Sequence, residues 1–274
     1  MILLEMLSYP FLVRAMVVGV LVSLCAALLG VPLVLKRYSM IGDGLSHVGF
    51  GALAIAAALN IAPLYLAVPV VVVAAVLLLR VSSGSRIKGD AAVALISSGA
   101  LAVGVLVISL TSGVNTNVSN YMFGSILSVG RSDAWLSAIL CAGVIAAFVL
   151  LYPRLFAVTF DESFARATGA NASAYNTLLA VLTAVTIVLG MRMMGALLIS
   201  SLVIFPALSA MRVCRTFKSV TVCAAVLSVV CFLVGMTASY ALETPSGASV
   251  VAVDIIAFVL CSVYARISEY IHKD

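Results

Sequence analysis

The sequence predicts an all-α, polytopic integral membrane protein, and three observations support this class. First, 64% of the 274 residues are hydrophobic and only 9% are charged, whereas a soluble domain is about 45–50% apolar and about 25% charged. Second, the apolar residues form runs of about 20 residues, enough for a helix to cross a hydrocarbon layer about 30 Å thick. Third, these runs are too long for barrel strands, which need only about ten alternating residues.

Nine runs of spanning length are separated by charged joints or by joints rich in Pro, Gly, Asn or Ser. They cover residues 11–35, 40–59, 63–79, 91–110, 134–151, 174–191, 195–211, 220–242 and 249–264. No segment between them is long enough for a soluble domain, so residues 1–274 are expected to form a single transmembrane domain. Pro32 and Pro206 fall inside spans, where each removes a backbone donor and favours a kink or a break.

The basic residues predict the orientation. Nine spans place twelve of the fifteen lysines and arginines on one side and only Arg14, Arg131 and Arg192 on the other. Because loops rich in Lys and Arg stay in the cytoplasm, the N-terminus is expected outside and the C-terminus inside. The net charge of +5 thus reflects insertion into lipid, and no nucleic-acid partner is expected.

Asp43 and His47 are the pair around which the other spans are expected to be arranged. They lie four residues apart in the second span, so on a helix they share a face with Cβ atoms about 5–6 Å apart. At 1.5 Å per residue, His47 lies about 15 Å beyond Arg37, near the middle of the membrane. The chain has two histidines, and the other, His272, is in the polar tail.

Ionisable residues at this depth are costly, which favours a transport pathway or relay. The structural alternative is an Asp–His hydrogen bond that holds two helices together. One oxygen and one nitrogen ligand suit zinc, manganese or iron(II) better than calcium or magnesium. Zinc prefers four ligands, and the pair supplies only two. The pair therefore predicts that a second copy of the chain, related by a two-fold axis, completes the coordination shell of the metal.

Other polar residues inside the spans are weaker candidates for the pathway. Ser46 could donate a hydrogen bond near the pair, although a membrane serine more often bonds its own helix backbone. Asp254 lies well inside the ninth span without a basic neighbour in sequence. Small-residue packing is the preferred interpretation of the glycines around the pair, which are Gly42, Gly44, Gly49 and Gly51. The six cysteines are scattered singly, which excludes a disulfide framework or a zinc finger.

The joint at 159–169, TFDESFARATG, predicts a short cytoplasmic helix. Thr159 or Asp161 would cap its start and Gly169 would end it. Phe160, Phe164 and Ala167 would form an exposed apolar face. That face could dock a partner protein or lie on the membrane, and the sequence does not decide between them.

No energy source is visible in the chain. The segment GSRIKGD at 84–90 has the glycine spacing of a phosphate loop but lacks the required Gly-Lys-Ser/Thr ending. The chain is therefore expected not to hydrolyse ATP and not to be an enzyme. The long external joint at 111–133 contains YMFGSIL at 121–127, which is too short to span and is expected to form a re-entrant or surface helix.

The sequence resembles one family, the membrane permease subunits of ATP-binding-cassette importers for zinc, manganese and iron. The resemblance covers nearly the whole chain in six ordered blocks. These are LVLKRYSMIGDGLSH at 33–47, GDAAVALISSGALAVGVL at 89–106, YMFGSIL at 121–127, FDESFARATG at 160–169, MGALLISSLVIFPA at 194–207 and ETPSGAS at 243–249.

The resemblance implies a homodimer, or a pair of related permeases, in the cell membrane of a prokaryote. Two cytoplasmic ATPase subunits and an extracytoplasmic metal-binding protein would be its partners. Asp43 and His47 match the family's metal-contacting pair. The block at 160–169 matches its coupling helix, which assigns contact with the ATPase to Phe160, Asp161, Glu162, Phe164, Ala165, Arg166 and Gly169.

The VGFGALA sequence after His47 is closer to the zinc-type branch than to many manganese-type members. Zinc is therefore the favoured cargo, with manganese or iron as alternatives, and no permanently bound cofactor is expected. Two other hypotheses stay open at this stage. One is a proton- or ion-coupled secondary transporter that uses Asp43 and His47 as a relay, and the other is a membrane scaffold without transport activity.

Overall fold

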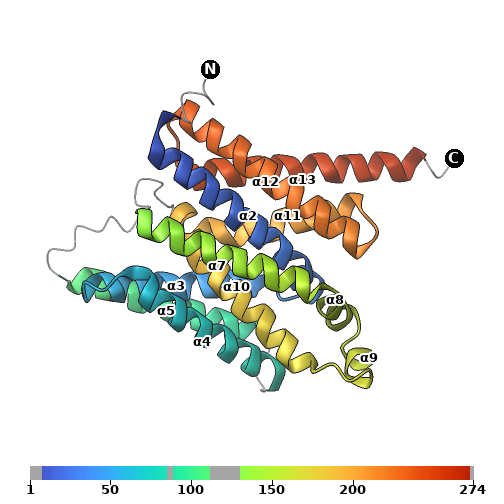
Figure 1. The fold of residues 1–274 in the computed structure, drawn as a ribbon, viewed down its shortest axis with the longest axis horizontal. Coiled ribbons are helices and arrows are strands. Elements are labelled where there is room, and N and C mark those ends of the chain that lie inside the picture. Colours follow the sequence, from blue (N-terminus) through green and yellow to red (C-terminus); the bar gives the residue numbers. More distant parts are fainter. Residues whose placement is uncertain (1–7, 85–88, 112–129, 272–274) are drawn as a thin grey trace.

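A computed structural model describes residues 8–84, 89–111 and 130–271, and Figure 1 shows their arrangement. Within these ranges the chain is helical, with short joints and no strand. The helices are α2 (Pro10–Leu35), α3 (Ser39–Ala58), α4 (Pro63–Gly84), α5 (Gly89–Leu110), α7 (Arg131–Leu150), α8 (Tyr152–Phe160), α9 (Glu162–Ala167), α10 (Ala172–Met194), α11 (Ala196–Val213), α12 (Phe217–Leu242) and α13 (Ser246–Ile271).

The described helices confirm the all-α membrane class. Eight of them are long and apolar enough to cross a membrane. The expected seventh span corresponds to α11, whose apolar part, Leu198–Val213, is shorter than the other eight. The helix is nevertheless buried along its length, with Ile199, Leu202 and Ala207 fully enclosed, so it belongs to the bundle.

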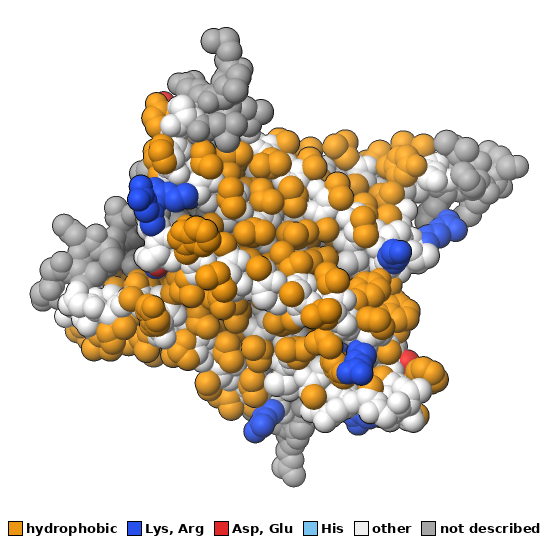
Figure 2. Space-filling model, in the orientation of Figure 1, with side chains coloured by type: hydrophobic (Ala, Val, Ile, Leu, Met, Phe, Trp, Pro, Cys, Tyr) orange, Lys and Arg blue, Asp and Glu red, His pale blue; other side chains and the backbone are white. Residues whose placement is uncertain are grey.

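The helices form one bundle in which α2, α7 and α10 cross the middle (Figure 1). On one side of them lie α3, α4 and α5, and on the other lie α12 and α13. Helix α11 contacts α2, α3, α10, α12 and α13, so it links the two sides. Hydrophobic side chains cover the middle of the face in Figure 2, and lysines and arginines lie toward its edges. This distribution fits a surrounding hydrocarbon layer.

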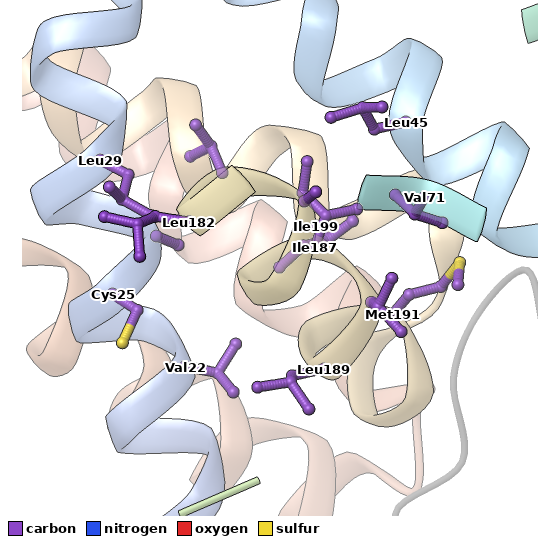
Figure 3. Close-up of a cluster of buried hydrophobic side chains, with 14 of the residues drawn as sticks. Val22, Cys25, Leu29, Leu45, Val71, Leu182, Ile187, Leu189, Met191 and Ile199 are labelled. Carbon is purple, nitrogen blue, oxygen red and sulfur yellow. The ribbon is translucent and has the colours of Figure 1, made fainter. Parts of the chain in front are cut away.

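The centre of the bundle is filled by aliphatic side chains from five helices (Figure 3). Val22, Cys25 and Leu29 come from α2, and the side chains of α10 lie opposite them. The other labelled contributors are Leu45 of α3, Val71 of α4 and Ile199 of α11. All of these labelled residues are at most 9% exposed, so this cluster fixes α3 relative to α2, α4, α10 and α11.

Glycines bring the helix backbones close together at several crossings. A Cβ added to Gly30 of α2 would lie 2.0 Å from the backbone oxygen of Val203 in α11. A Cβ added to Gly51 of α3 would lie 2.8 Å from the backbone oxygen of Ala100 in α5. Because lipid tails are as apolar as leucine, helices in membranes associate through such close van der Waals packing.

Three local predictions differ from the structure or fall outside it. Helices α2 and α11 continue through Pro32 and Pro206, so neither proline breaks its span. After α7 the chain forms the separate helix α8, which the sequence analysis did not predict. The predicted surface helix at 121–127 and most of the segment at 84–90 lie outside the described residues.

We predict that Gly30→Ala destabilises the protein. The new methyl group meets a backbone atom of α11 that cannot move alone, and overpacking of this kind costs about 1–3 kcal/mol. A loss of 1 kcal/mol lowers the melting temperature of a chain this long by about 2–4 °C. Thermal unfolding of the purified protein in detergent measures the change.

Gly143→Ala in α7 is the matched control, because an added Cβ there has nothing within 4 Å. Alanine favours a helix over glycine by about 1 kcal/mol, so this variant should be as stable as the wild type or more stable. Equal melting temperatures for Gly30→Ala and Gly143→Ala would contradict the close crossing of α2 and α11.

Candidate functional site

Helix α3 carries the Asp43 and His47 pair close to its start. The turn before it is strained, because Arg37 is a non-glycine residue with φ +60°. Asp43 and His47 face each other along the helix, with 3.7 Å between His47 Nε2 and Asp43 Oδ2. Their side chains are 41% exposed for Asp43 and 14% exposed for His47. The pair therefore lies at the edge of a partly open space.

Ser200 of α11 is the third member of this group. Its hydroxyl donates a 3.4 Å hydrogen bond to Asp43 Oδ1 across 157 residues of sequence. The sequence analysis missed this residue, and the only signal was the Ser-Ser pair at 200–201. His47 Nδ1 is buried and has no hydrogen-bond partner within the described part of the chain. The hydrogen-bonding capacity of this ring nitrogen is thus unused within the described chain.

Ser46 does not point toward the pair. It is fully buried, and its hydroxyl donates to the backbone oxygen of Asp43 at 2.7 Å. The backbone bond foreseen for a membrane serine is the one observed, so the structure gives no support to Ser46 as a pathway residue.

Three of the four glycines around the pair have a packing role. An added Cβ would lie 2.7 Å from Val93 at Gly44, 2.5 Å from Met191 at Gly49 and 2.8 Å from Ala100 at Gly51. Nothing lies within 4 Å of an added Cβ at Gly42. Gly42 is therefore the exception among the four.

Asp254 belongs to a different part of the bundle. It is 1% exposed on α13 and lies near Cys231 of α12. Its Oδ2 atom has no hydrogen-bond partner among the residues that the structure covers. The structure does not group Asp254 with Asp43 and His47 as ligands, since the described residues contain no cluster of three or more His, Cys, Asp or Glu able to hold a metal.

A cavity of about 230 Å³ lies at the start of α3, one turn before Asp43. Its lining combines charged side chains with apolar ones. The residues are Lys36, Arg37, Tyr38, Met40, Ile41, Leu78, Asp90 and Val93. Asp90 thus lines a partly polar space at the predicted cytoplasmic ends of α3 and α5.

The predicted short helix at 159–169 is present as α9. Asp161 is its N-cap and accepts a 2.9 Å hydrogen bond from the Phe164 backbone, and Gly169 follows it with φ +86°. Phe160 lies on α8 rather than α9, but Phe160 and Phe164 are 60% and 61% exposed. Ala165 is fully buried against Val158 and Ala172. Ala165 therefore anchors α9 to the bundle and cannot be a contact residue on its surface.

Glu162 connects α9 to the turn before α3. Its carboxylate forms an ion pair with Lys36 at 3.6 Å and with Arg166 at 2.6 Å, and it accepts a 3.3 Å hydrogen bond from Asn176 of α10. Lys36 also donates a hydrogen bond to Asn176. The Lys36 side chain is 9% exposed. We call Lys36, Glu162 and Asn176 the α9 anchor.

The anchor shifts the pKa of both charged groups. Burial lowers the pKa of Lys36, although the Glu162 charge opposes this effect. Burial alone would raise the pKa of Glu162, but the hydrogen bonds from Arg166 and Asn176 and the Lys36 charge together lower it below 4.5. The carboxylate of Glu162 is thus held in its charged form at neutral pH.

At the opposite end of the bundle, Arg192 of α10 forms a 3.0 Å ion pair with Asp133 of α7. The sequence analysis placed both residues on the external side. The contact agrees with that orientation, because it brings the end of α10 and the start of α7 together.

Comparison with known proteins identifies the family. The family model of the ABC 3 transport family matches residues 8–265, which is nearly the whole described chain. The chain belongs to the ABC 3 transport family. It is therefore a multi-pass membrane permease of the ATP-binding-cassette type, as the sequence resemblance predicted, and not the ATPase itself.

The chain is also similar to membrane proteins named for the transport of different metals. The chain is 30% identical over 252 residues to the high-affinity zinc uptake system membrane protein ZnuB of Haemophilus influenzae, covering 92% of this chain and 97% of that protein. It is 28% identical over 256 residues to the manganese transport system membrane protein MntC of Halalkalibacterium halodurans, covering 93% and 88%.

The fold also matches a solved structure of PsaBC from Streptococcus pneumoniae in complex with Fab. The TM-score is 0.85 at 24% identity, and the match covers 97% of this chain and 99% of the other. At this level of identity the likeness supports the all-helical fold alone.

Proposed function

We propose that this chain is the permease subunit of an ATP-driven importer of a divalent transition metal, with zinc as the favoured cargo. The observation that carries the proposal is the pair formed by Asp43 and His47, which lies inside the bundle next to Ser200. ZnuB and MntC, whose names state zinc and manganese, are similar to this chain over nearly its full length.

The geometry of the pair suits a metal ion better than a hydrogen bond. The 3.7 Å separation of His47 Nε2 and Asp43 Oδ2 exceeds the usual hydrogen-bond range of about 2.7–3.2 Å. Two ligand atoms on one tetrahedral zinc, each about 2.0–2.1 Å from it, would lie about 3.3–3.4 Å apart. A small movement would therefore allow both residues to bind the same ion, while Ser200 orients the carboxylate.

One chain supplies too few ligands to complete the coordination shell of a metal ion, and this supports a dimer. Zinc prefers four ligands, and the described residues offer only Asp43 and His47 at this place. Two copies would supply two carboxylates and two imidazoles. An incomplete shell in each copy also allows release, because a transport site must bind weakly enough to let its ion leave.

The outward face of α5 is where we place the second copy. Helix α5 packs more extensively on α3 than any other helix does, and among the eight spans only α13 is less buried. Ala94, Ser98 and Ala102 recur every four residues on its exposed side. Small residues at this spacing let two membrane helices approach closely, so α5 would pack against its own copy across a two-fold axis.

Helix α9 would receive the motion of the ATPase. Its exposed Phe164, together with Phe160 at the end of α8, offers an apolar contact beyond the bundle, and Figure 1 shows α8 and α9 at the edge of the molecule. The α9 anchor joins this contact to Lys36, which directly precedes the turn into α3. Movement of α9 would thus act on the helix that carries Asp43 and His47. An extracytoplasmic binding protein would deliver the metal from the other side.

We predict that Asp43→Ala or His47→Ala reduces metal uptake more than about tenfold, because each removes one of two ligands. The measurement is ATP-dependent uptake of isotopic zinc and manganese into vesicles that contain the chain, its ATPase and its binding protein. Ser209→Ala on α11 is the control, since this buried serine is not part of the pair. Uptake that survives both substitutions would contradict the site, and uptake without ATP would favour a secondary transporter.

We predict that Ser98→Cys cross-links two copies with a short thiol-specific reagent. The residue is exposed in the middle of the α5 stripe, so its two copies should lie close to the two-fold axis. Ile139→Cys on α7, where the side chain is 65% exposed, should give no more dimer than the wild type. Equal cross-linking at both positions, measured by gel electrophoresis, would contradict this interface.

We predict different effects for three substitutions around α9. Phe164→Asp should prevent co-purification of the ATPase, because a charge replaces the apolar contact. Lys36→Gln should keep the ATPase bound but reduce the metal transported per ATP hydrolysed, because it breaks the link to α3. Arg166→Gln, which removes an exposed partner of the same Glu162 carboxylate but keeps the Lys36 ion pair, should leave the metal transported per ATP hydrolysed unchanged. An unchanged transport ratio in Lys36→Gln would contradict the anchor's role.

A further inference from the structure

A groove lies between α2 and α7 at their predicted external ends. Its volume is about 440 Å³, within the range of about 300–1,000 Å³ typical of small-molecule sites. It is lined by Val13, Arg14, Val17, Val18, Arg131, Ala134, Trp135 and Ala138. None of these residues belongs to the Asp43 site or to the α9 anchor.

The surface of the groove is apolar, and its two arginines lie toward the external end. Arg131 is the first residue of α7, and Arg14 lies in the first turns of α2. At 1.5 Å per residue, Ala138 lies about 10 Å further along α7 than Arg131. The remaining residues between these levels are apolar, with Trp135 73% exposed and Val17 54% exposed. Tryptophan is typical of the boundary between headgroups and hydrocarbon.

The two arginines have no acidic partner in the part of the chain that the structure describes. Arg14 Nε donates only to the backbone oxygen of Pro10 at 3.1 Å. The acid nearest to Arg131 in sequence, Asp133, forms an ion pair with Arg192. In Figure 2 basic side chains gather at the edge of the molecule where α7 begins, beside hydrophobic ones. Two cations above an apolar groove favour a ligand that has an anionic headgroup and an apolar chain.

We propose that this groove binds one anionic phospholipid of the outer leaflet. The phosphate would accept hydrogen bonds from Arg14 and Arg131, because guanidinium groups match phosphate oxygens in charge and geometry. An acyl chain would lie between α2 and α7, against Val17 and Trp135. A protein ligand fits less well, because the groove runs along membrane-spanning helices into the hydrocarbon layer.

The chain contains a single tryptophan, so the fluorescence of Trp135 reports this groove directly. The full-length protein is reconstituted in phosphatidylcholine vesicles that contain a small, equal fraction of either brominated phosphatidylglycerol or brominated phosphatidylcholine. Bromine on the acyl chain quenches tryptophan at short range. Since each arginine near a membrane surface favours an anionic lipid about fivefold, we expect phosphatidylglycerol to quench at a several-fold lower mole fraction than phosphatidylcholine.

Substitutions of the two arginines test whether they bind the lipid headgroup. Arg14→Gln and Arg131→Gln should each reduce the preference, and the double substitution should bring the ratio of the two lipids to about one. Arg215→Gln, an exposed cation at the other end of the bundle, should retain the wild-type ratio. The measurement needs no transport activity, so its result is independent of the proposed function.

Three results would overturn the proposal. Equal quenching by the two lipids in the wild type would mean that α2 and α7 contact only unselected lipid. A preference that survives the double substitution would mean that the arginines do not hold the headgroup. Trp135 fluorescence that neither lipid quenches would mean that a protein, such as a second copy of the chain, covers the groove.

Discussion

The close packing of α3 against its neighbours is the constraint on which the rest of the structure depends. Lipid supplies no hydrophobic force that drives one apolar helix onto another, so the contact must come from short van der Waals distances. Gly44 and Gly51 bring α3 within such distances of α5, and Gly49 does the same toward Met191 of α10. These contacts hold Asp43 and His47 at one place although both residues are costly to bury.

The polar pair is stabilised by few groups, and this has a physical reason. A fully satisfied Asp–His pair would be a static link between helices, with its hydrogen bonds complete. Here the two side chains are 3.7 Å apart and 41% of the Asp43 side chain is exposed. Only Ser200 donates to the carboxylate from another described helix. The arrangement holds both side chains in position and leaves part of their hydrogen-bonding capacity unused within the described chain.

The sequence predicted the helices well because a membrane allows little else. Every backbone polar group in lipid must be satisfied within the helix, so run length and charge are enough to locate the spans. The local rules for caps also succeeded at Asp161 and Gly169, where the side chain or the left-handed backbone acts within three residues. The same rules did not predict α8, because the residues after Leu150 carry Pro153 and Arg154 and look like the end of a span.

Contacts between distant residues could not be predicted from one sequence. Ser200 reaches Asp43 across 157 residues, and Lys36 reaches Asn176 across 140. Neither contact leaves a local pattern, since serine and lysine have more common roles in membrane proteins. Ala165 was assigned to the surface of α9 on its resemblance to a family block, and only the packing against Val158 and Ala172 shows that it is buried.

Lys36 has a role both in membrane insertion and in the folded protein. During insertion its charge contributes to the excess of Lys and Arg that keeps this side in the cytoplasm. In the folded chain the same ammonium group is 9% exposed and paired with Glu162 of α9. Burial lowers the pKa of Lys36, and the ion pair with Glu162 offsets part of this effect, so α9 helps to keep the lysine charged. The position of α9 is thereby linked to the turn that begins α3, and through α3 to Asp43 and His47.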